Sequence, residues 1–165
     1  MQRYSNLINA IVLHICSMQV LNLPTYSFRI KEENDEQYIY DIVRSKFILL
    51  TKEEWVRQHI LHYLITDLGY PKGLIKVESG VAYNRRPKRS DIVVYNNLGN
   101  ADILVECKSP DMPINQSTME QAAMYTKTLK ANYIVLTNGM THYTFSFDSD
   151  GKLKNLQSIP KYNRH

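Results

Sequence analysis

The hydrophobic pattern of the first half of the chain predicts short strands followed by one helix. Residues 25–50 predict two or three short strands around an acidic turn at Glu33 to Glu36. Thr51 then has the position of a helix N-cap, with Glu54 as its capping-box partner and Gly69 as the stop. The predicted helix has about 17 residues. Its expected apolar stripe comprises Val56, Ile60, Tyr63 and Leu64.

The second half of the chain predicts a sheet with one more helix. Strands are expected at residues 74–78, 91–95 and 101–108, and a helix at residues 117–130. The segment "NYIVLTNGMTHYTFSF" predicts a strand, an Asn138-Gly139 turn and a second strand. This order favours an α/β sandwich, with a central mixed sheet flanked by helices. The segment after Gly151 is expected to be loose.

The strand "DILVECKSP", residues 102–110, ends in two opposite charges. Because side chains alternate along a strand, Leu104, Glu106 and Lys108 share one face. Ile103, Val105 and Cys107 share the other, so one face can stay in the core. A Glu-x-Lys tripeptide is weak evidence alone, since chance gives about 0.6 per chain of this composition. The pair is therefore either a solvated strand end or part of a site.

The hairpin before this strand supplies a second carboxylate. Its turn, "NNLGN", centres between Leu98 and Gly99, and a symmetric register then pairs Asp91 with Glu106. Their Cβ atoms would lie roughly 5 Å apart on one face. Opposed carboxylates repel unless a positive charge lies between them, and Mg²⁺ or Mn²⁺ would fit.

We therefore predict a metal site for phosphodiester cleavage at the end of this hairpin. The expected ligands are Asp91, Glu106 and the backbone carbonyl of Cys107. Lys108 would hold or deprotonate the attacking water. The alternative is that Lys108 merely neutralises a surface pair of carboxylates, and the hairpin alone does not decide between the two.

Composition is consistent with one domain of ordinary size. The chain has 165 residues, a net charge of +4 and a pI near 9.0, which permits a polyanionic partner without requiring one. The two cysteines, Cys16 and Cys107, suit a reducing cytosol, and we expect a cytoplasmic protein without a membrane segment. Residues 1–17 are expected to be an extension, and Met18 offers a second start, so their native status is open. The expected division is residues 1–17, a domain at 18–150 and a tail at 151–165.

The motifs together resemble a known group of nucleases. Asp91 in "KRSDIVVY" and Glu106-Cys107-Lys108 in "ILVECKSP" resemble the PD-(D/E)xK nuclease superfamily. With "TKEEWVRQHILHYLITDLGYPKGLIKVE", Gln121-x-x-x-Tyr125 and "YIVLTNGMTHYTF", the order is similar to the N-terminal domain of type I restriction enzyme R subunits and their stand-alone relatives. The resemblance covers about residues 20–147, and Ser90 stands where the superfamily has its namesake proline. It implies a restriction-endonuclease-like fold and Mg²⁺-dependent DNA cleavage.

The resemblance also implies residues that assist the site. An acidic residue on the first helix is expected, and the helical wheel favours Glu53 over Glu54, with Glu78 as a third candidate. The helix of Gln121 and Tyr125 would support metal ligands or substrate. A basic run would meet DNA phosphates, although it can also be a solvated loop: Arg85, Arg86, Lys88 and Arg89.

The expected partners follow from the same comparison. DNA is the expected substrate, and restriction or helicase subunits would act in trans because the sequence has no phosphate-binding loop for ATP. The sequence permits an oligomer without requiring one. The alternative function is a DNA-binding or subunit-docking module that keeps the fold without independent activity.

Overall fold

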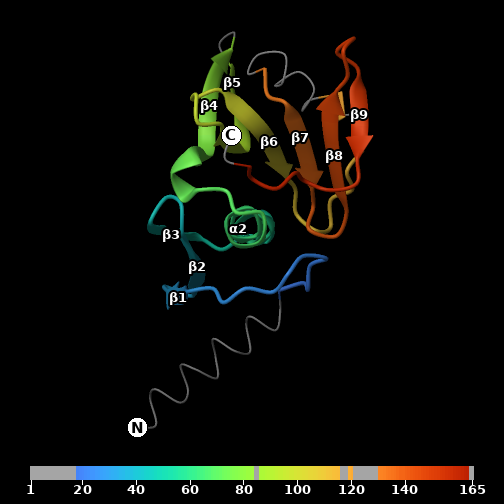
Figure 1. The fold of residues 1–165 in the computed structure, drawn as a ribbon. Helices are drawn as coiled ribbons and strands as arrows, with labels where there is room; N and C mark the ends of the chain where they lie inside the picture. Colours follow the sequence, from blue (N-terminus) through green and yellow to red (C-terminus); the bar gives the residue numbers. More distant parts are fainter. Residues whose placement is uncertain (1–17, 84–85, 116–118, 121–129, 164–165) are drawn as a thin grey trace.

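Two sheets and one α-helix make up the described part of the computed structural model, which covers residues 18–83, 86–115, 119–120 and 130–163 (Figure 1). The smaller sheet has the strand order β1-β2-β3, and the larger has the order β4-β5-β6-β7-β8-β9. The elements are β1 (Ile30–Glu33), β2 (Glu36–Asp41), β3 (Lys46–Leu49), α2 (Lys52–His62), β4 (Ile75–Tyr83), β5 (Arg86–Tyr95), β6 (Ala101–Cys107), β7 (Tyr133–Thr137), β8 (His142–Phe147) and β9 (Leu153–Leu156).

The larger sheet is mixed, as the sequence predicts. β6 and β7 are parallel, and every other neighbouring pair in this sheet is antiparallel. The predicted α/β class is confirmed. Among the described residues, α2 is the one α-helix with assigned bounds. The helix predicted at 117–130 lies largely outside the described residues.

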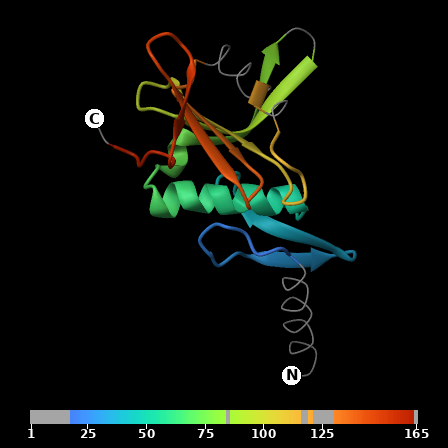
Figure 2. The same ribbon diagram turned by 90° about the vertical axis from the view of Figure 1, so that its right-hand side faces the viewer.

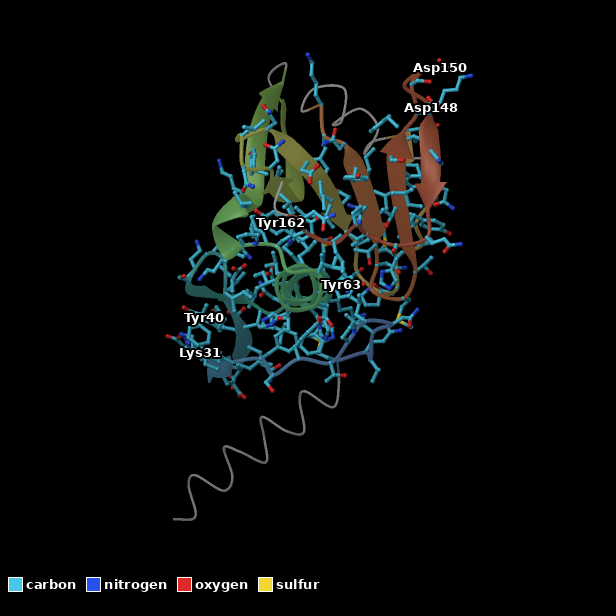
Figure 3. All side chains as sticks on the ribbon, viewed as in Figure 1. Lys31, Tyr40, Tyr63, Asp148, Asp150 and Tyr162 are labelled. Carbon is cyan, nitrogen blue, oxygen red and sulfur yellow. The ribbon has the colours of Figure 1, made fainter. Side chains whose placement is uncertain are left out.

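Helix α2 lies between the two sheets (Figures 1 and 2). The smaller sheet is antiparallel, and its register aligns Ile30, Ile39 and Ile48 in one row. Ile39 is fully buried and packs in the same core as α2. Lys31 and Tyr40 lie on the side of this sheet away from the helix (Figure 3). The helix therefore has protein on two sides, where the sequence predicted a single apolar stripe.

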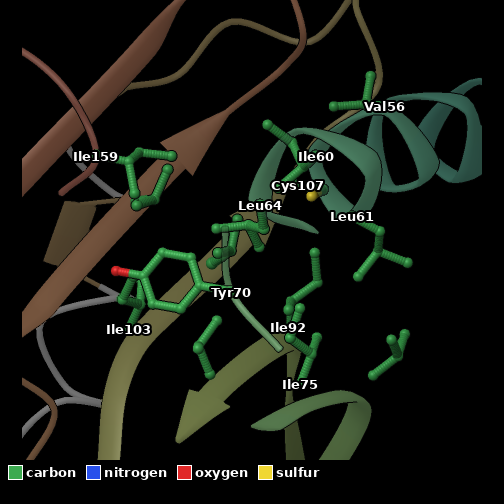
Figure 4. Close-up of a cluster of buried hydrophobic side chains, with 14 of the residues drawn as sticks. Val56, Ile60, Leu61, Leu64, Tyr70, Ile75, Ile92, Ile103, Cys107 and Ile159 are labelled. Carbon is green, nitrogen blue, oxygen red and sulfur yellow. The ribbon is translucent and has the colours of Figure 1, made fainter. Parts of the chain in front are cut away.

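The main core lies between α2 and the face of the larger sheet that packs against it (Figure 4). Three predicted stripe residues, Val56, Ile60 and Leu64, are buried there, and Tyr63 is partly buried against the same cluster. From the sheet come Ile92, Ile103, Val105 and Cys107, whose alternation with Val93 and Leu104 follows the predicted faces. Val93 and Leu104 belong to a separate cluster on the other face.

Both ends of α2 show the expected signals with one change in geometry. The Thr51 hydroxyl oxygen accepts a 3.0 Å hydrogen bond from the Glu54 backbone N–H, which confirms the N-cap. At the other end the α-helix stops at His62 and continues as a π-helical turn, Tyr63–Asp67. Gly69 follows with φ of +79°, a conformation that favours glycine and ends the helical segment.

The described residues after Gly151, 152–163, are not loose, so the prediction of a loose tail is wrong for them. β9 pairs with β8 in antiparallel register. Beyond it, Ile159 is buried in the main core, and the Tyr162 backbone N–H donates to the Leu68 carbonyl at 2.8 Å. The polar, lysine-bearing sequence of β9 suits an edge strand with solvent on it, which is why it lacks the pattern of a buried strand.

The segment before β1 is also part of the fold. Leu21 is buried in the main core, and the Gln19 carbonyl accepts a 3.1 Å hydrogen bond from the Trp55 indole. The Asn22 backbone N–H donates to the Gly139 carbonyl at 2.8 Å. Residues 1–17 lie outside the described residues, so the prediction about their status stays a prediction.

Gly139 supports a test of this packing. It has φ of +81°, and a Cβ at this position would come within 2.7 Å of a Leu21 methyl and 3.0 Å of a Val56 methyl. Gly99 has nearly the same φ, +79°, with nothing within 4 Å. We predict that Gly139→Ala lowers the thermal midpoint several degrees more than Gly99→Ala, because both share a backbone cost of about 1–2 kcal/mol but only Gly139 adds a clash. Equal shifts in thermal unfolding would show that Leu21 yields freely.

Candidate active site

The β5–β6 hairpin brings two acidic side chains to neighbouring strands. The register pairs Ile92 with Val105 and Val93 with Leu104, as the predicted symmetric hairpin requires. One residue beyond the Ile92–Val105 pair come Asp91 and Glu106, and the negative charge of Asp91 is close enough to raise the pKa of Glu106. The register departs from the prediction at a shift between Val94 and Tyr95, near the turn and away from the acidic pair.

Asp91 is held from two directions. Its Oδ2 accepts a 2.6 Å hydrogen bond from the backbone N–H of Cys107, and its Oδ1 accepts a 2.8 Å bond from Arg57 Nη2. The side chain is 15% exposed. The carboxylate therefore has a fixed position next to the residue that follows Glu106.

Glu106 is hydrogen-bonded on one side only. Its Oε1 accepts a 2.6 Å bond from Lys108 Nζ, whereas Oε2 is buried without a hydrogen-bond partner. Burial and the negative charge of Asp91 raise the pKa of Glu106 above its usual value, against the opposing effect of Lys108. An unpartnered carboxylate oxygen beside a second carboxylate is a position that attracts a cation.

Lys108 is a cation in this arrangement. Burial lowers its pKa, but the hydrogen bond to Glu106 and the charges of Glu106, Asp91 and Glu53 outweigh that effect, so the pKa is raised overall. The amine is thus protonated at neutral pH. Of the two roles predicted for Lys108, holding a water fits this state, and removing a proton from it does not.

Glu53 and Glu54 point into different environments. Glu53 is 43% exposed, and its Oε1 accepts a 3.0 Å bond from Arg57 Nη2, the nitrogen that also contacts Asp91. Glu54 is buried and accepts hydrogen bonds from Arg44, Arg57 and Gln58. The structure thus brings Glu53, the preferred residue, close to Asp91, and gives Glu54 a role inside the protein instead of the predicted return bond of a capping box.

Arg57, which was not among the predicted site residues, lies between the acidic residues of α2 and the β5–β6 hairpin. Its guanidinium contacts Glu53, Glu54 and Asp91, and its side chain is 7% exposed. The available signal was its spacing of three and four residues from two acids on one helix. Burial lowers the pKa of Arg57, but Coulombic interactions with Asp91, Cys107 and Glu54 raise it by more, so the pKa is raised overall. The group is therefore a permanent cation.

A buried polar network continues from Arg57 to the smaller sheet. Arg44 Nη2 donates to Glu54 Oε1 at 2.8 Å, and Arg44 Nε donates to Asp41 Oδ2 at 2.7 Å. Gln58 Nε2 bridges the same two carboxylates at 2.8 Å each. Burial raises the pKa of Asp41, but its hydrogen bonds to Arg44 and Gln58 more than offset this, so the pKa is lowered overall. The turn after β2 is thereby connected to Asp91.

Several predicted residues cannot be placed beside this site. Gln121, Tyr125 and Arg85 lie outside the described residues. The other basic residues, Arg86, Lys88 and Arg89, are in strand β5, which leads directly to Asp91, so that part of the run is not a loop. Glu78 lies in β4, also a strand rather than a strand end.

The donor set fits a magnesium ion better than a metal with many protein ligands. Within the described ranges no group of three or more His, Cys, Asp or Glu side chains has the arrangement of a metal site. Mg²⁺ needs only one or two carboxylates, with water and phosphate oxygens as further ligands. Asp91 and the open Oε2 of Glu106 supply that minimum.

The described helices also include none long and apolar enough to cross a membrane.

Comparison with solved structures supports the fold class. A fragment assigned to the HsdR subunit of a type I restriction enzyme from Vibrio vulnificus YJ016 matches with a TM-score of 0.51 and 22% identity. The match covers 68% of this chain and 24% of the HsdR fragment, so the present sequence corresponds to about a quarter of that fragment. Among curated proteins, none matches the sequence. The class is therefore an α/β domain of the restriction-endonuclease type.

The family follows from the sequence itself. Residues 52–160 match the model of the family described as "Type I restriction enzyme R protein N terminus (HSDR_N)", which is about two-thirds of the chain. The chain belongs to this family. The match begins at α2 and runs past β9, so it includes Asp91, Glu106 and Lys108 as well as Arg57. The resemblance predicted from the motifs is confirmed at this level.

The raised pKa of Glu106 predicts that the stability of the domain depends on pH. A carboxyl group whose pKa is raised on folding binds protons more tightly in the native state, so stability falls as pH rises from the unfolded toward the folded pKa. We predict that Glu106→Gln, studied in EDTA, raises the thermal midpoint by a few degrees at pH 7.5 and changes it little at pH 4. A variant less stable than the natural chain at pH 7.5 would show that the Lys108 pairing outweighs burial.

Proposed function

We propose that this domain hydrolyses phosphodiester bonds of DNA with Mg²⁺, or Mn²⁺ in its place. The observation that carries the proposal is that Asp91 and Glu106 lie close together on adjacent strands, with one Glu106 oxygen buried and unpartnered. Membership of the family of R protein N-termini supports a role in restriction-modification. DNA as substrate implies work in the cytoplasm.

In this proposal each residue has a definite task. Asp91 and Glu106 would hold the metal, and the carbonyl of Cys107 would complete the protein ligands. The bound metal supplies an activated water and neutralises charge on the phosphate. Lys108 donates to Glu106 Oε1 and leaves Oε2 open, so Oε2 would be the oxygen that holds the metal. The remaining N–H groups of Lys108 would hold the attacking water or a phosphate oxygen.

Glu53 and the basic residues of β5 would assist around this centre. Glu53 is partly exposed and lies next to Asp91 through Arg57, so it can bind a metal-associated water. Arg86, Lys88 and Arg89 precede Asp91 on the same strand and would approach DNA phosphates. Gln121 and Tyr125 remain proposed support for ligands or substrate.

A second candidate function is a DNA-binding or subunit-docking module without its own cleavage activity. The observation that favours it is that Asp91 and Glu106 each already have a cationic partner, Arg57 and Lys108. Restriction or helicase subunits, or a second copy of the chain, would then complete the function. The two functions differ in whether purified protein cuts DNA.

The test is nicking of supercoiled plasmid by the purified chain with Mg²⁺ or Mn²⁺. We predict that Asp91→Asn, Glu106→Gln and Lys108→Ala each reduce the rate by about 100-fold or more, because each removes a group that holds the metal or the water. The control is Asp102→Asn, which makes the same chemical change at the opposite end of β6 and should keep full activity. Circular dichroism would check that each variant is folded.

Two results would contradict the proposal. Equal nicking by all variants would assign the cleavage to a contaminant or to another part of the chain. Metal-independent DNA binding without nicking, even with restriction subunits added, would favour the docking module.

A further inference from the structure

Arg57 contacts the proposed metal ligand from inside the protein. Its Nη2 atom lies 2.8 Å from Asp91 Oδ1 and 3.0 Å from Glu53 Oε1, so one nitrogen bridges a carboxylate on β5 and a carboxylate on α2. Its Nη1 atom donates to Glu54. The positive charge of the guanidinium thus lies between two carboxylates and stabilises their ionised forms, as a bound cation would.

The two proposed ligands therefore differ in how open they are. Asp91 has a donor on each oxygen, namely Arg57 and the Cys107 N–H. Glu106 has a donor on Oε1 alone, and Oε2 is open. A cation can reach Glu106 directly, but at Asp91 it must share an oxygen with a guanidinium or displace it.

We propose that Arg57 is a positioning residue that acts as a resident counter-ion, holds Asp91 in place without metal, and lowers the affinity of the site for divalent cations. The inference rests on the proposed function, since it needs a metal bound between Asp91 and Glu106. It assigns Arg57 the regulation of metal occupancy. Arg57 donates a hydrogen bond to Glu54, and Glu54 also accepts one from Arg44. The position of Arg57 is therefore linked to the turn after β2, which carries Arg44.

A purely structural role for Arg57 makes a different prediction. Arg44 is the matched comparison, because it is also an arginine in the same network and pairs with Glu54 and Asp41. Arg44 pairs with Asp41 and Glu54, whereas Arg57 pairs with Asp91 of the proposed metal site. If both arginines serve only the fold, replacing either one should lower the stability of the domain and leave its affinity for metal unchanged.

The experiment measures Mn²⁺ binding by calorimetry on the full chain for the natural protein, Arg57→Met and Arg44→Met. We expect Arg57→Met to bind Mn²⁺ about tenfold more tightly, because a like charge beside the ion is removed. Its thermal midpoint should be lower without metal and should rise more on metal addition than that of the natural protein. Arg44→Met should lose stability with a change in affinity of less than about twofold.

The Mn²⁺ affinities of the natural chain and Arg57→Met distinguish failure of this inference from failure of the proposed function. If the natural chain and Arg57→Met both bind Mn²⁺ with the same affinity, or the variant binds more weakly, the counter-ion role is overturned and the nuclease proposal stands. If neither binds Mn²⁺, the proposed metal site fails and the inference fails with it. Binding by the variant alone would support the inference.

A second variant keeps the test decisive where Arg57→Met does not fold. Arg57→Lys retains the positive charge but offers one nitrogen in place of the planar pair that contacts Glu54 and Asp91 together. We expect its Mn²⁺ affinity to exceed that of the natural chain by less than the tenfold of Arg57→Met. Weaker binding by Arg57→Lys would overturn the proposal.

Discussion

The ion pair between Glu54 and Arg57 lies inside the protein because α2 has a sheet on either side. A helix in that position buries residues on more than one face, and any charge among them must find a partner within reach. Here the partners form one network, from Asp41 through Arg44, Glu54 and Arg57 to Asp91. Removing one member of a buried pair typically costs about 3–5 kcal/mol, so the positions of these side chains are strongly coupled.

This coupling explains how two elements far apart in the sequence define one site. The hairpin alone would place Asp91 beside Glu106 with mutual repulsion, and the helix supplies the positive charge that fixes Asp91. Glu106 remains under-satisfied, with a raised pKa and an open oxygen. A group left in that condition lowers stability, and such a cost is common where a binding site needs an available ligand.

Much of the fold and the centre of the site could be predicted because they depend on local rules. Alternation gave the faces of β6, turn position gave the register of the hairpin, and side-chain capping gave the start of α2. The second sheet over α2, the burial of Glu54 and the role of Arg57 depend on contacts between distant segments, which period and spacing do not report. β9 was missed because an edge strand can be short and polar.

The position of Cys107 has a consequence for the redox behaviour of the site. Its backbone N–H holds Asp91, while its side chain is fully buried in the main core. Burial raises the pKa of the thiol well above its ordinary value, so the reactive thiolate is suppressed. The residue at the centre of the site thus contributes its backbone, and its sulfur is shielded from oxidants and alkylating reagents for as long as the domain is folded.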